Sequence, residues 1–548
     1  MAGYKTHLTV LQKTAQATPL LTALKIPQLS SDDELQGWKD ITYSQLLHDV
    51  EQFAKYWSRE LSEKGIDSGS VIGLWLRGIT YLDLLHIWGI SRAGYIPQLI
   101  SAHLTSNAVV GELLSESKAK GLIHDAAIAV SVGEDIPTFP AVDFLDLAVE
   151  QSSLAELNSP TSGEEIVFIL HSSGSTSGKP KLVPATARWL DCNIRKAQHF
   201  TFRGPGAEYQ ETVVANGSFC HVANTLALIS YVNKGSCMAL PSSLPYSLPE
   251  LKRIVKECKV TVLNMFSSFM AGVIKEARKD LELLAMLQSF DACTYGGLPL
   301  EEAEGAWARE KGINLVDLFA STEVGCMFMG VGGRHGNLLR IWPGSTFEMR
   351  PISVVPDDTV SGASSNAADG APTGKLVELV VPKHAPECPH PSVCDPTTGD
   401  FITGDVFLEV GPDRYISKGR NDDWIKMEIS LRCDTRSIES NALETCGKDL
   451  ISAAVVLGAA RPSPALFVEP KQTEGHDGLQ AEILRRITPF HERRYKHERI
   501  LDSRLIIVVP HGTLPRTAKG SIQRKLVERK FKQDLDRIYS EVYPRNQT

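Results

Sequence analysis

A run of small hydroxylated and basic residues lies between positions 172 and 181. It reads Ser172-Ser173-Gly174-Ser175-Thr176-Ser177-Gly178-Lys179-Pro180-Lys181 and follows the apolar segment Val167–Leu170. Glycines let the backbone approach phosphate oxygens, hydroxyls and N–H groups donate hydrogen bonds to them, and lysines neutralise their charge. The run therefore predicts a polyphosphate-binding loop that follows a strand. A flexible Ser/Gly linker is the alternative if the loop is considered alone.

This loop differs from the Walker A loop of P-loop nucleotidases. The spacing from Gly174 to Gly178 is one residue too short, and Lys179 is followed by Pro180 where Walker A has Ser or Thr. The sequence therefore predicts phosphate binding of another kind.

Carboxylates follow two further strand-like segments. Asn314–Phe319 leads into Ala320-Ser321-Thr322-Glu323, and Phe401-Ile402 leads into Thr403-Gly404-Asp405. Open α/β sheets bind ligands at the carboxyl ends of their strands, so both carboxylates are candidates for ligand binding. Mg²⁺ at a phosphate site needs only one or two carboxylates, which makes Glu323 a candidate metal ligand. A solvated loop glutamate is the alternative.

Together these segments resemble the signature motifs of the adenylate-forming superfamily, which contains acyl-CoA synthetases, luciferases and adenylation domains of nonribosomal peptide synthetases. The phosphate loop is similar to the family's SSGSTG-x-PK, with Ser177 as an extra residue. Five later segments resemble further motifs of the family, in the family's order. They are 296–300 (GGxPL), 319–323 (YGxTE), 401–405 (YxTGD), 419–422 (GRxD) and 514–525 (LPxTxxGK). Segments 430–435 and 515–520 resemble, more narrowly, the adenylation domains of fungal synthetase-like carboxylic acid reductases.

The resemblance implies a role for each matching residue. Phosphate contacts would come from Ser172, Ser173, Gly174, Ser175, Thr176, Gly178, Lys181 and Thr322. Gly296 and Gly297 would lie against adenine, and Ala320 and Ser321 would complete the cofactor-binding set. Asp405 and Arg420 would bind the ribose, Asp422 would be the pivot between two domains, and Glu323 would hold Mg²⁺. Surface charge is the alternative for Arg420 and Asp422.

The catalytic lysine of this family normally follows the glycine of the last motif, but here that place is Ser521. Lys519 lies two residues earlier. On an extended strand, residues i and i+2 project from the same face, so the long side chain of Lys519 could reach the same point. Lys519 is our candidate and Lys525 the second choice, with a purely surface lysine as the alternative.

Residues 216–224 are the segment that we align with the acid-binding region of the family. Amino-acid-activating relatives carry an Asp there, which pairs with the substrate ammonium group, but this segment has no acidic residue. An α-amino acid is therefore disfavoured, since its buried ammonium group would lack a partner. His221 lies where relatives that activate aryl and acyl acids place a His or an aromatic residue, although a core histidine is possible. Phe266, Phe319 and Met327 would help to line an apolar pocket, although each residue taken singly is better explained as part of the core; an aromatic acid is favoured.

Short apolar runs alternate with amphipathic ones, which predicts βαβ units. Strands are expected at Val71–Trp75, Val167–Leu170, Thr261–Phe266 and Asn314–Phe319, and helices at Tyr43–Glu60, Pro249–Lys256 and Ser521–Tyr543. Residues 354–374 are expected to form a loop. The predicted fold class is α/β. A large N-terminal domain of parallel or mixed sheets covered by helices (1–420) would be joined by a hinge to a small, mobile α+β domain (421–548).

Composition sets limits on the function. The chain has 548 residues, a net charge of -8 and 10 cysteines. Its length predicts two or more domains, its charge disfavours nucleic acid and anionic membranes, and its sparse cysteines indicate a reducing compartment. Charged residues interrupt the most apolar stretch, Val71–Ile100, so a membrane span is not expected. A cytoplasmic location is expected.

The sequence therefore predicts an AMP-forming ligase that uses ATP and Mg²⁺ to activate a carboxylic acid. The acceptor would be the phosphopantetheine thiol of a carrier protein. The alternatives are a free-standing acyl- or aryl-CoA ligase and a non-catalytic nucleotide-binding relative. A metal-binding module at His384, Cys388, His390 and Cys394 is a third alternative, although the spacing suits no standard zinc site.

Overall fold

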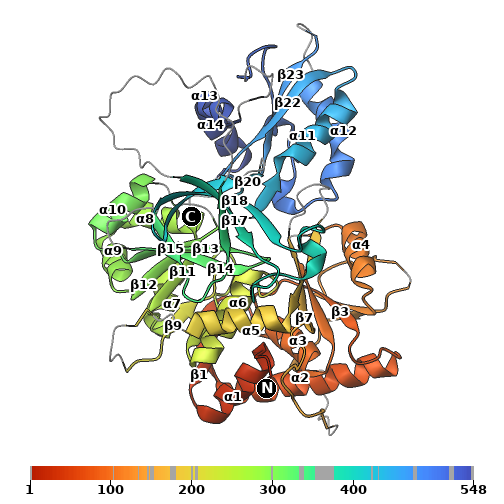
Figure 1. Ribbon diagram of the computed structural model, residues 1–548, viewed down its shortest axis with the longest axis vertical. Coiled ribbons are helices and arrows are strands. Elements are labelled where there is room, and N and C mark those ends of the chain that lie inside the picture. Colours follow the sequence, from red (N-terminus) through yellow and green to blue (C-terminus); the bar gives the residue numbers. More distant parts are fainter. Residues whose placement is uncertain are drawn as a thin grey trace.

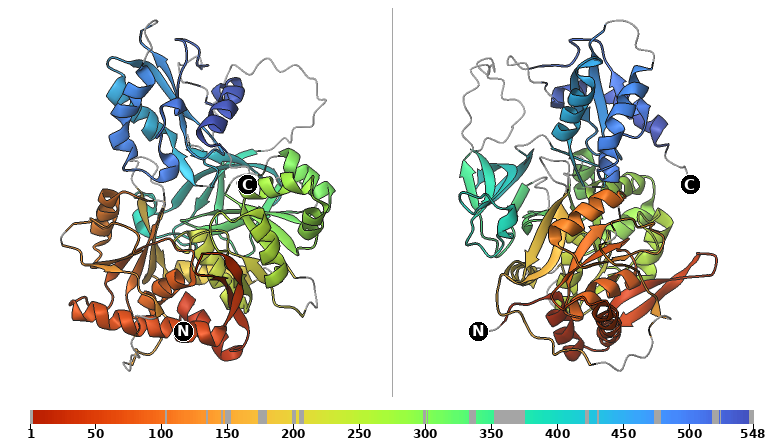
Figure 2. Two further views of the ribbon diagram at one scale, coloured as in Figure 1. Left: turned by 180° about the vertical axis from the view of Figure 1, so that it is seen from behind. Right: turned by 90° about the vertical axis from the view of Figure 1, so that its right-hand side faces the viewer.

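The computed structural model describes residues 3–544, except 103, 134, 145–146, 148–152, 173–179, 199–201, 204–207, 298–299, 301, 333–337, 352–374, 421–423, 430, 473–477, 517–521 and 523. Residues up to about 420 form a broad α/β body, and the C-terminal residues form a smaller unit that lies against it (Figure 1). Figure 2 shows the same division from two other sides.

A six-stranded sheet, in the described residues, carries the predicted phosphate loop. Its strand order is β6-β5-β3-β4-β7-β8. All neighbours are parallel except β7 and β8, which are antiparallel. The strands are β3 (Val71–Leu76), β4 (Ile96–Ser101), β5 (Gly121–His124), β6 (Thr138–Pro140), β7 (Ile166–Ser172) and β8 (Lys181–Thr186).

The largest sheet in the described residues has 13 strands in the order β16-β17-β18-β19-β15-β14-β13-β12-β11-β9-β10-β1-β2. Strands β13 to β1 run parallel, and antiparallel strands extend the sheet at both ends. The strands are β1 (Thr22–Leu29), β2 (Leu35–Thr42), β9 (Thr212–Val214), β10 (Cys237–Ala239), β11 (Val262–Phe266), β12 (Ala292–Gly296), β13 (Leu315–Ser321), β14 (Gly325–Gly330), β15 (Leu338–Ile341), β16 (Glu348–Pro351), β17 (Lys375–Val381), β18 (Phe401–Gly411) and β19 (Arg414–Arg420).

The helices begin where the sequence supplies caps. Thr42 accepts a hydrogen bond from Gln45 N, Thr80 and Asp83 form a capping box, and Ser247 precedes a proline in the first turn. The helices of the body are α1 (His7–Ala17), α2 (Tyr43–Glu63), α3 (Tyr81–Arg92), α4 (Asn107–Ser117), α5 (Ala187–Gln198), α6 (Val222–Lys234), α7 (Leu248–Cys258), α8 (Ser267–Ala277), α9 (Leu281–Gln288) and α10 (Glu302–Glu310).

The C-terminal unit has a hydrophobic core of its own. The buried residues of that core all lie between Ile425 and Tyr539. They come from a hairpin, a three-stranded sheet in the order β22-β23-β24 and the helices that cover it. The elements are β20 (Trp424–Lys426), β21 (Arg432–Asp434), α11 (Thr435–Cys446), β22 (Ile451–Leu457), β23 (Ala465–Pro470), α12 (Leu479–His491), η3 (Lys496–Glu498), η4 (Ser503–Leu505), β24 (Ile506–Val508), α13 (Arg524–Lys530) and α14 (Lys532–Val542).

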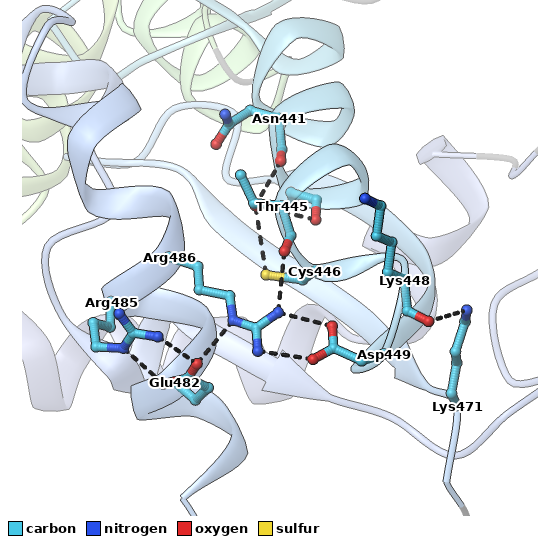
Figure 3. A network of polar contacts seen from close by, with 10 residues as sticks. Asn441, Thr445, Cys446, Lys448, Asp449, Lys471, Glu482, Arg485 and Arg486 are labelled. Atoms are coloured by element: carbon cyan, nitrogen blue, oxygen red, sulfur yellow. Dashed lines mark hydrogen bonds and ion pairs between the residues drawn. The ribbon is translucent and has the colours of Figure 1, made fainter.

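A polar network joins the two long helices of this unit (Figure 3). Arg486 of α12 makes a bidentate contact with Asp449, at 2.7 and 2.8 Å, and donates to the Thr445 carbonyl at the end of α11. It also contacts Glu482 one turn earlier, at 2.8 Å. The planar guanidinium thus fixes α12 against α11 beside the sheet.

The structure confirms the α/β class and the predicted strands and helices, with two refinements. The expected C-terminal helical run begins at Arg524 and breaks at Phe531 into α13 and α14. The expected loop at 354–374 lies outside the described residues. No helix among the described residues is long and apolar enough to cross a membrane.

Candidate active site

The β7–β8 hairpin positions the two described ends of the phosphate loop. Ser172 and Lys181 are Cα partners in this antiparallel pair, so residues nine apart in the sequence lie side by side. Both line a large cavity. Ser173, Gly174, Ser175, Thr176, Ser177, Gly178 and Lys179 lie outside the described residues.

The glycine pair at 296–297 follows β12 on the same cavity. A Cβ at Gly296 would lie 2.8 Å from the Leu318 carbonyl oxygen, so a larger residue would push the neighbouring strands apart. Gly297 has φ of +91°, a conformation that side chains disfavour. Strand packing at Gly296 and the positive φ of Gly297 thus explain why glycines stand at this part of the cavity lining.

Thr322 and Glu323 lie in the short turn between β13 and β14, and both line the cavity. The Glu323 carbonyl accepts a hydrogen bond from Trp189 Nε1 of α5 at 2.8 Å, which holds the backbone of the turn against α5. Ala320 and Ser321, at the end of β13, line the same cavity. Ser321 Oγ is buried and has no hydrogen-bond partner among the described atoms. The turn thus presents one carboxylate and several hydroxyls to the cavity.

Asp405 and Arg420 are Cα partners on β18 and β19. Asp405 is 4% exposed and lines the cavity, and its N–H donates to Thr403 Oγ1 at 2.9 Å. The Thr403 hydroxyl in turn donates to the Leu379 carbonyl at 2.8 Å. The backbone pairing thus places Arg420 beside Asp405.

One cavity of about 490 Å³ brings these segments together from positions 172 to 405. Among its described lining residues the carboxylates are Glu323 and Asp405, whereas the ammonium groups come from Lys181, Lys196, Lys234 and Lys426. Lys196 and Lys234 pair with the buried Glu387 and Glu211, so Lys181 and Lys426 are the lining lysines that suit a polyanion. Sequence motifs did not indicate Lys196, Lys234 or Lys426 at this site, since none of the three belongs to a recognised motif.

The C-terminal unit closes one side of the cavity. Lys426, Tyr495 and His497 line it, and Tyr495 Oη lies 3.1 Å from His171 Nδ1. His171 Nε2 accepts a hydrogen bond from Ser101 N at 3.0 Å, so Nδ1 carries the proton of the neutral ring and donates to Tyr495. Burial lowers the pKa of His171 to about 4 and keeps this arrangement neutral. No motif in the sequence indicated the contact.

His221 caps α6 and lines the cavity, as expected for a residue beside the acid. Its Nδ1 accepts from Ala223 N at 3.3 Å, and its ring meets Phe266 edge to face at 6.3 Å. Phe266 lines the cavity, whereas Phe319 and Met327 do not and are core residues, which was the alternative for each. Phe319 packs in a separate core, 5.0 Å from the Phe407 ring, and Met327 is fully buried beside it. Alternation along β13 and β14 turns these side chains away.

For four predicted residues, nothing can be said of the side chains. Lys519 and Asp422 are outside the described residues, and so are the side chains of Arg420 and Lys525. The metal-binding alternative is contradicted within the described part of the chain, because no group of three or more potential ligands occurs there. Cys388 and Cys394 instead contact each other, with their Sγ atoms 3.7 Å apart.

Two family models match this chain. "AMP-binding enzyme" matches residues 11–345, and "AMP-binding enzyme C-terminal domain" matches residues 422–543. The chain is 31% identical over 523 residues to the AMP-binding domain-containing enzyme iboA of Amanita muscaria, covering 93% of this chain and 98% of iboA. It is 23% identical to the adenylate-forming reductase stbB of Stachybotrys bisbyi, over 84% of this chain but only 42% of stbB.

The fold is also that of a solved structure, an o-succinylbenzoate CoA synthetase of Bacillus subtilis bound with a product analogue. The two share a TM-score of 0.67 and 17% identity, over 95% of this chain and 98% of the synthetase. The similarity to adenylate-forming reductases confirms the narrower resemblance that the sequence indicated.

Proposed function

The chain belongs to the AMP-binding enzyme family, and from that premise we propose that it activates a carboxylic acid with ATP as an acyl-adenylate. The observation that carries the proposal is the single cavity lined by Ser172, Lys181, Gly296–Gly297, Thr322–Glu323 and Asp405. These residues are spread over more than two hundred positions. Their convergence on one cavity supports the proposal that phosphate, adenine, metal and ribose are bound in one site.

The reaction joins two anions. A carboxylate oxygen attacks the α-phosphorus of ATP, the bond from that phosphorus to the bridging oxygen breaks, and pyrophosphate leaves. Positioning and charge compensation must supply most of the rate enhancement. Lys181 and Thr322 line the cavity where phosphates would lie, and the hydroxyls of Ser175 and Thr176 and the ammonium of Lys519 would add to them.

The residues present also fit Mg²⁺. Glu323 is the single carboxylate in the turn after β13, and Mg²⁺ bound to a nucleotide completes its ligands with phosphate oxygens and water. Bound there, Mg²⁺ would neutralise phosphate charge. Glu323 would hold it, and the hydrogen bond from Trp189 to the Glu323 backbone would keep the carboxylate in place.

We propose an acid without an α-ammonium group. Residues 216–223 line the cavity through Asn216, Cys220, His221, Val222 and Ala223, so the segment aligned with the acid-binding region does reach the site. The carboxylates of the described lining, Glu323 and Asp405, both belong to the nucleotide side. His221 and Phe266 offer aromatic faces, which favours an aryl acid.

A second cavity supports transfer of the acyl group to a thiol. It has about 280 Å³ and shares Asn216 and Met265 with the first. Glu428, in the hairpin of the C-terminal unit, lines it, and the Glu428 carbonyl accepts a hydrogen bond from the Ser268 hydroxyl of α8. A narrow, mostly apolar passage beside the acyl site suits a pantetheine arm, although the family's usual glycine is absent from Ile425–Leu431.

The acceptor that we propose first is the phosphopantetheine thiol of a carrier protein, because the chain is similar to adenylate-forming reductases. The second is coenzyme A, favoured by the fold it shares with a CoA synthetase. For either acceptor, we propose two domains, 1–420 and 421–548, with Asp422 as the pivot. The separate hydrophobic core of the C-terminal unit supports this division.

The experiment is ATP–pyrophosphate exchange with Mg²⁺ and a panel of aryl, aliphatic, keto and amino acids. Exchange with one acid class and its loss in Lys519→Ala would support adenylation and the displaced lysine. Exchange that persists in Lys519→Ala but is lost in Lys525→Ala would assign the role to Lys525. Absence of exchange with every acid, while nucleotide still binds, would favour the non-catalytic alternative. Adding coenzyme A or a carrier domain, with thioester formation followed by mass, would then distinguish the acceptors.

A further inference from the structure

Two polar side chains lie on the wall that strands β11 and β12 give to the large cavity. Asn264 of β11 and Thr294 of β12 are Cα partners, and both line the cavity. The preceding residues on the two strands, Leu263 and Cys293, are buried in the core that the sheet forms with helices α7 to α9. Because side chains alternate along a strand, Asn264 and Thr294 point to the opposite face, where the cavity lies.

Along β11 this wall is short. Two residues before Asn264, Val262 is 0% exposed, so the wall is closed at that level. Two residues after it, Phe266 ends the strand and meets the His221 ring edge to face. A strand rises about 3.3 Å per residue, which places Asn264 about 6.6 Å below the edge of the sheet where the strands end.

The reacting carboxylate belongs at that edge under the proposed function. Gly297 follows the end of β12, and Thr322–Glu323 follow the end of β13, beside it in the sheet. These are the segments that we assign to adenine, phosphate and metal. An acid whose carboxylate reaches them and whose body runs back along β11 therefore meets Asn264 at its far end.

The Asn264 amide is oriented by its neighbour. Thr294, which is 2% exposed, donates a hydrogen bond from Oγ1 to Asn264 Oδ1 at 3.0 Å. The other end of the amide is Nδ2, which carries two N–H donors and cannot accept. Within the described part of the chain, no acceptor lies within hydrogen-bond distance of Nδ2. Asn264 is only partly buried, so these donors are open to the cavity.

A bound acid displaces water from this amide. A donor that loses water and gains no partner is costly, whereas a donor that meets an acceptor is not. The amide is neutral, so a hydroxyl or carbonyl oxygen suits it without requiring a buried charge on the ligand. A methyl group at the same place would leave Nδ2 unpaired.

We propose that Asn264 selects an aryl acid that carries a neutral oxygen at the ring position opposite the carboxyl group. With bonds of about 1.4 to 1.5 Å, that oxygen lies roughly 6 Å from the carboxyl carbon of a benzoic acid, which matches the depth of Asn264 below the edge. The ring would lie beside Phe266 and His221. This inference rests on the proposed function and narrows its substrate class from aryl acids to oxygenated ones.

The test compares pyrophosphate exchange with 4-hydroxybenzoic, 4-methylbenzoic and 4-aminobenzoic acids, which differ little in size. The wild type should use the hydroxy acid about tenfold better than the methyl acid, in kcat/KM, because the hydroxyl gives the amide an acceptor. In Asn264→Leu, which has a similar volume and no polar group, that ratio should fall to about one. Asn314→Leu makes the same change at an exposed position just before β13 and should keep the wild-type ratio.

Asn264→Asp provides a second arm, because it keeps the shape of the side chain and replaces the N–H donors by an oxygen that accepts. This variant should use 4-aminobenzoic acid several-fold better, relative to the methyl acid, than the wild type does. The inference is overturned if the wild type uses the methyl acid as well as the hydroxy acid, or if Asn264→Leu keeps the preference. It is also overturned if Asn264→Asp leaves the use of the amine unchanged, or if only acids other than aryl acids support exchange. No exchange with any acid would overturn the proposed function itself.

Discussion

Replacing Lys196 with methionine should destabilise the protein by leaving Glu387 as an uncompensated buried charge. Glu387 is 0% exposed, and its Oε1 accepts a hydrogen bond from Thr346 N at 2.9 Å and lies 3.5 Å from Lys196 Nζ. Burial, with Glu387 as the next cause, raises the pKa of Cys192 beside this pair to about 12. Removing one member of a buried pair typically costs about 3–5 kcal/mol. The long N–O distance and the remaining bond from Thr346 place the expected loss near the lower end, at about 3 kcal/mol.

The assay is urea unfolding followed by tryptophan fluorescence, since Trp342 Nε1 donates to the Lys196 carbonyl and reports on this region. Lys196→Met/Glu387→Gln should recover most of the lost stability, because it removes both charges. Arg537→Ala breaks an exposed pair with Asp534 and should change stability by no more than about 0.5 kcal/mol. A single variant as stable as the wild type, or a double variant no better than the single one, would refute the reasoning.

Three further predictions test other contacts. Tyr495→Phe leaves the buried Nδ1–H of His171 without its acceptor and should cost about 1–3 kcal/mol, measured as easier release of the C-terminal unit in limited proteolysis; unchanged protection would argue against the contact. Burial raises the pKa of Asp317 to about 7, against opposing effects of Lys426 and Arg309. Between about pH 4 and 7 the Asp317 carboxyl is therefore protonated in the folded protein but ionised in the unfolded chain. Its contribution to the free energy of unfolding falls as the pH rises through this range. Asp317→Asn should flatten that part of the stability–pH profile, and an unchanged slope would contradict the prediction. Gly296→Ala places a Cβ against the Leu318 carbonyl and should lower the free energy of unfolding by about 1–3 kcal/mol, measured by urea unfolding; unchanged stability would contradict it.

Much of the site could be predicted from the sequence because its parts are local motifs. The strand before Ser172, the glycine pair at 296 and the turn at Thr322–Glu323 each depend on a few neighbouring residues. Their order along the chain was enough to indicate one nucleotide site, and the structure does bring them to one cavity.

The remaining walls of the cavity could not be predicted in the same way. Phe319 and Met327 were candidates for either the pocket or the core, because the direction of a strand's side chains depends on register, which cannot be read from one sequence. Lys234 and Lys196 reach the cavity because α5 packs against α6, and Tyr495 reaches it because the C-terminal unit docks on the body. Such contacts join residues that are distant in the sequence and leave no local pattern.

The most direct test of acyl-adenylate formation uses an acid that carries ¹⁸O in its carboxylate. If a carboxylate oxygen attacks the α-phosphorus, turnover in the presence of a thiol must leave one ¹⁸O in AMP, and Glu323→Gln should strongly reduce the amount formed. We predict label in AMP and none in inorganic phosphate. Label in inorganic phosphate, with ADP as the other product, would show attack on the γ-phosphorus and contradict the account.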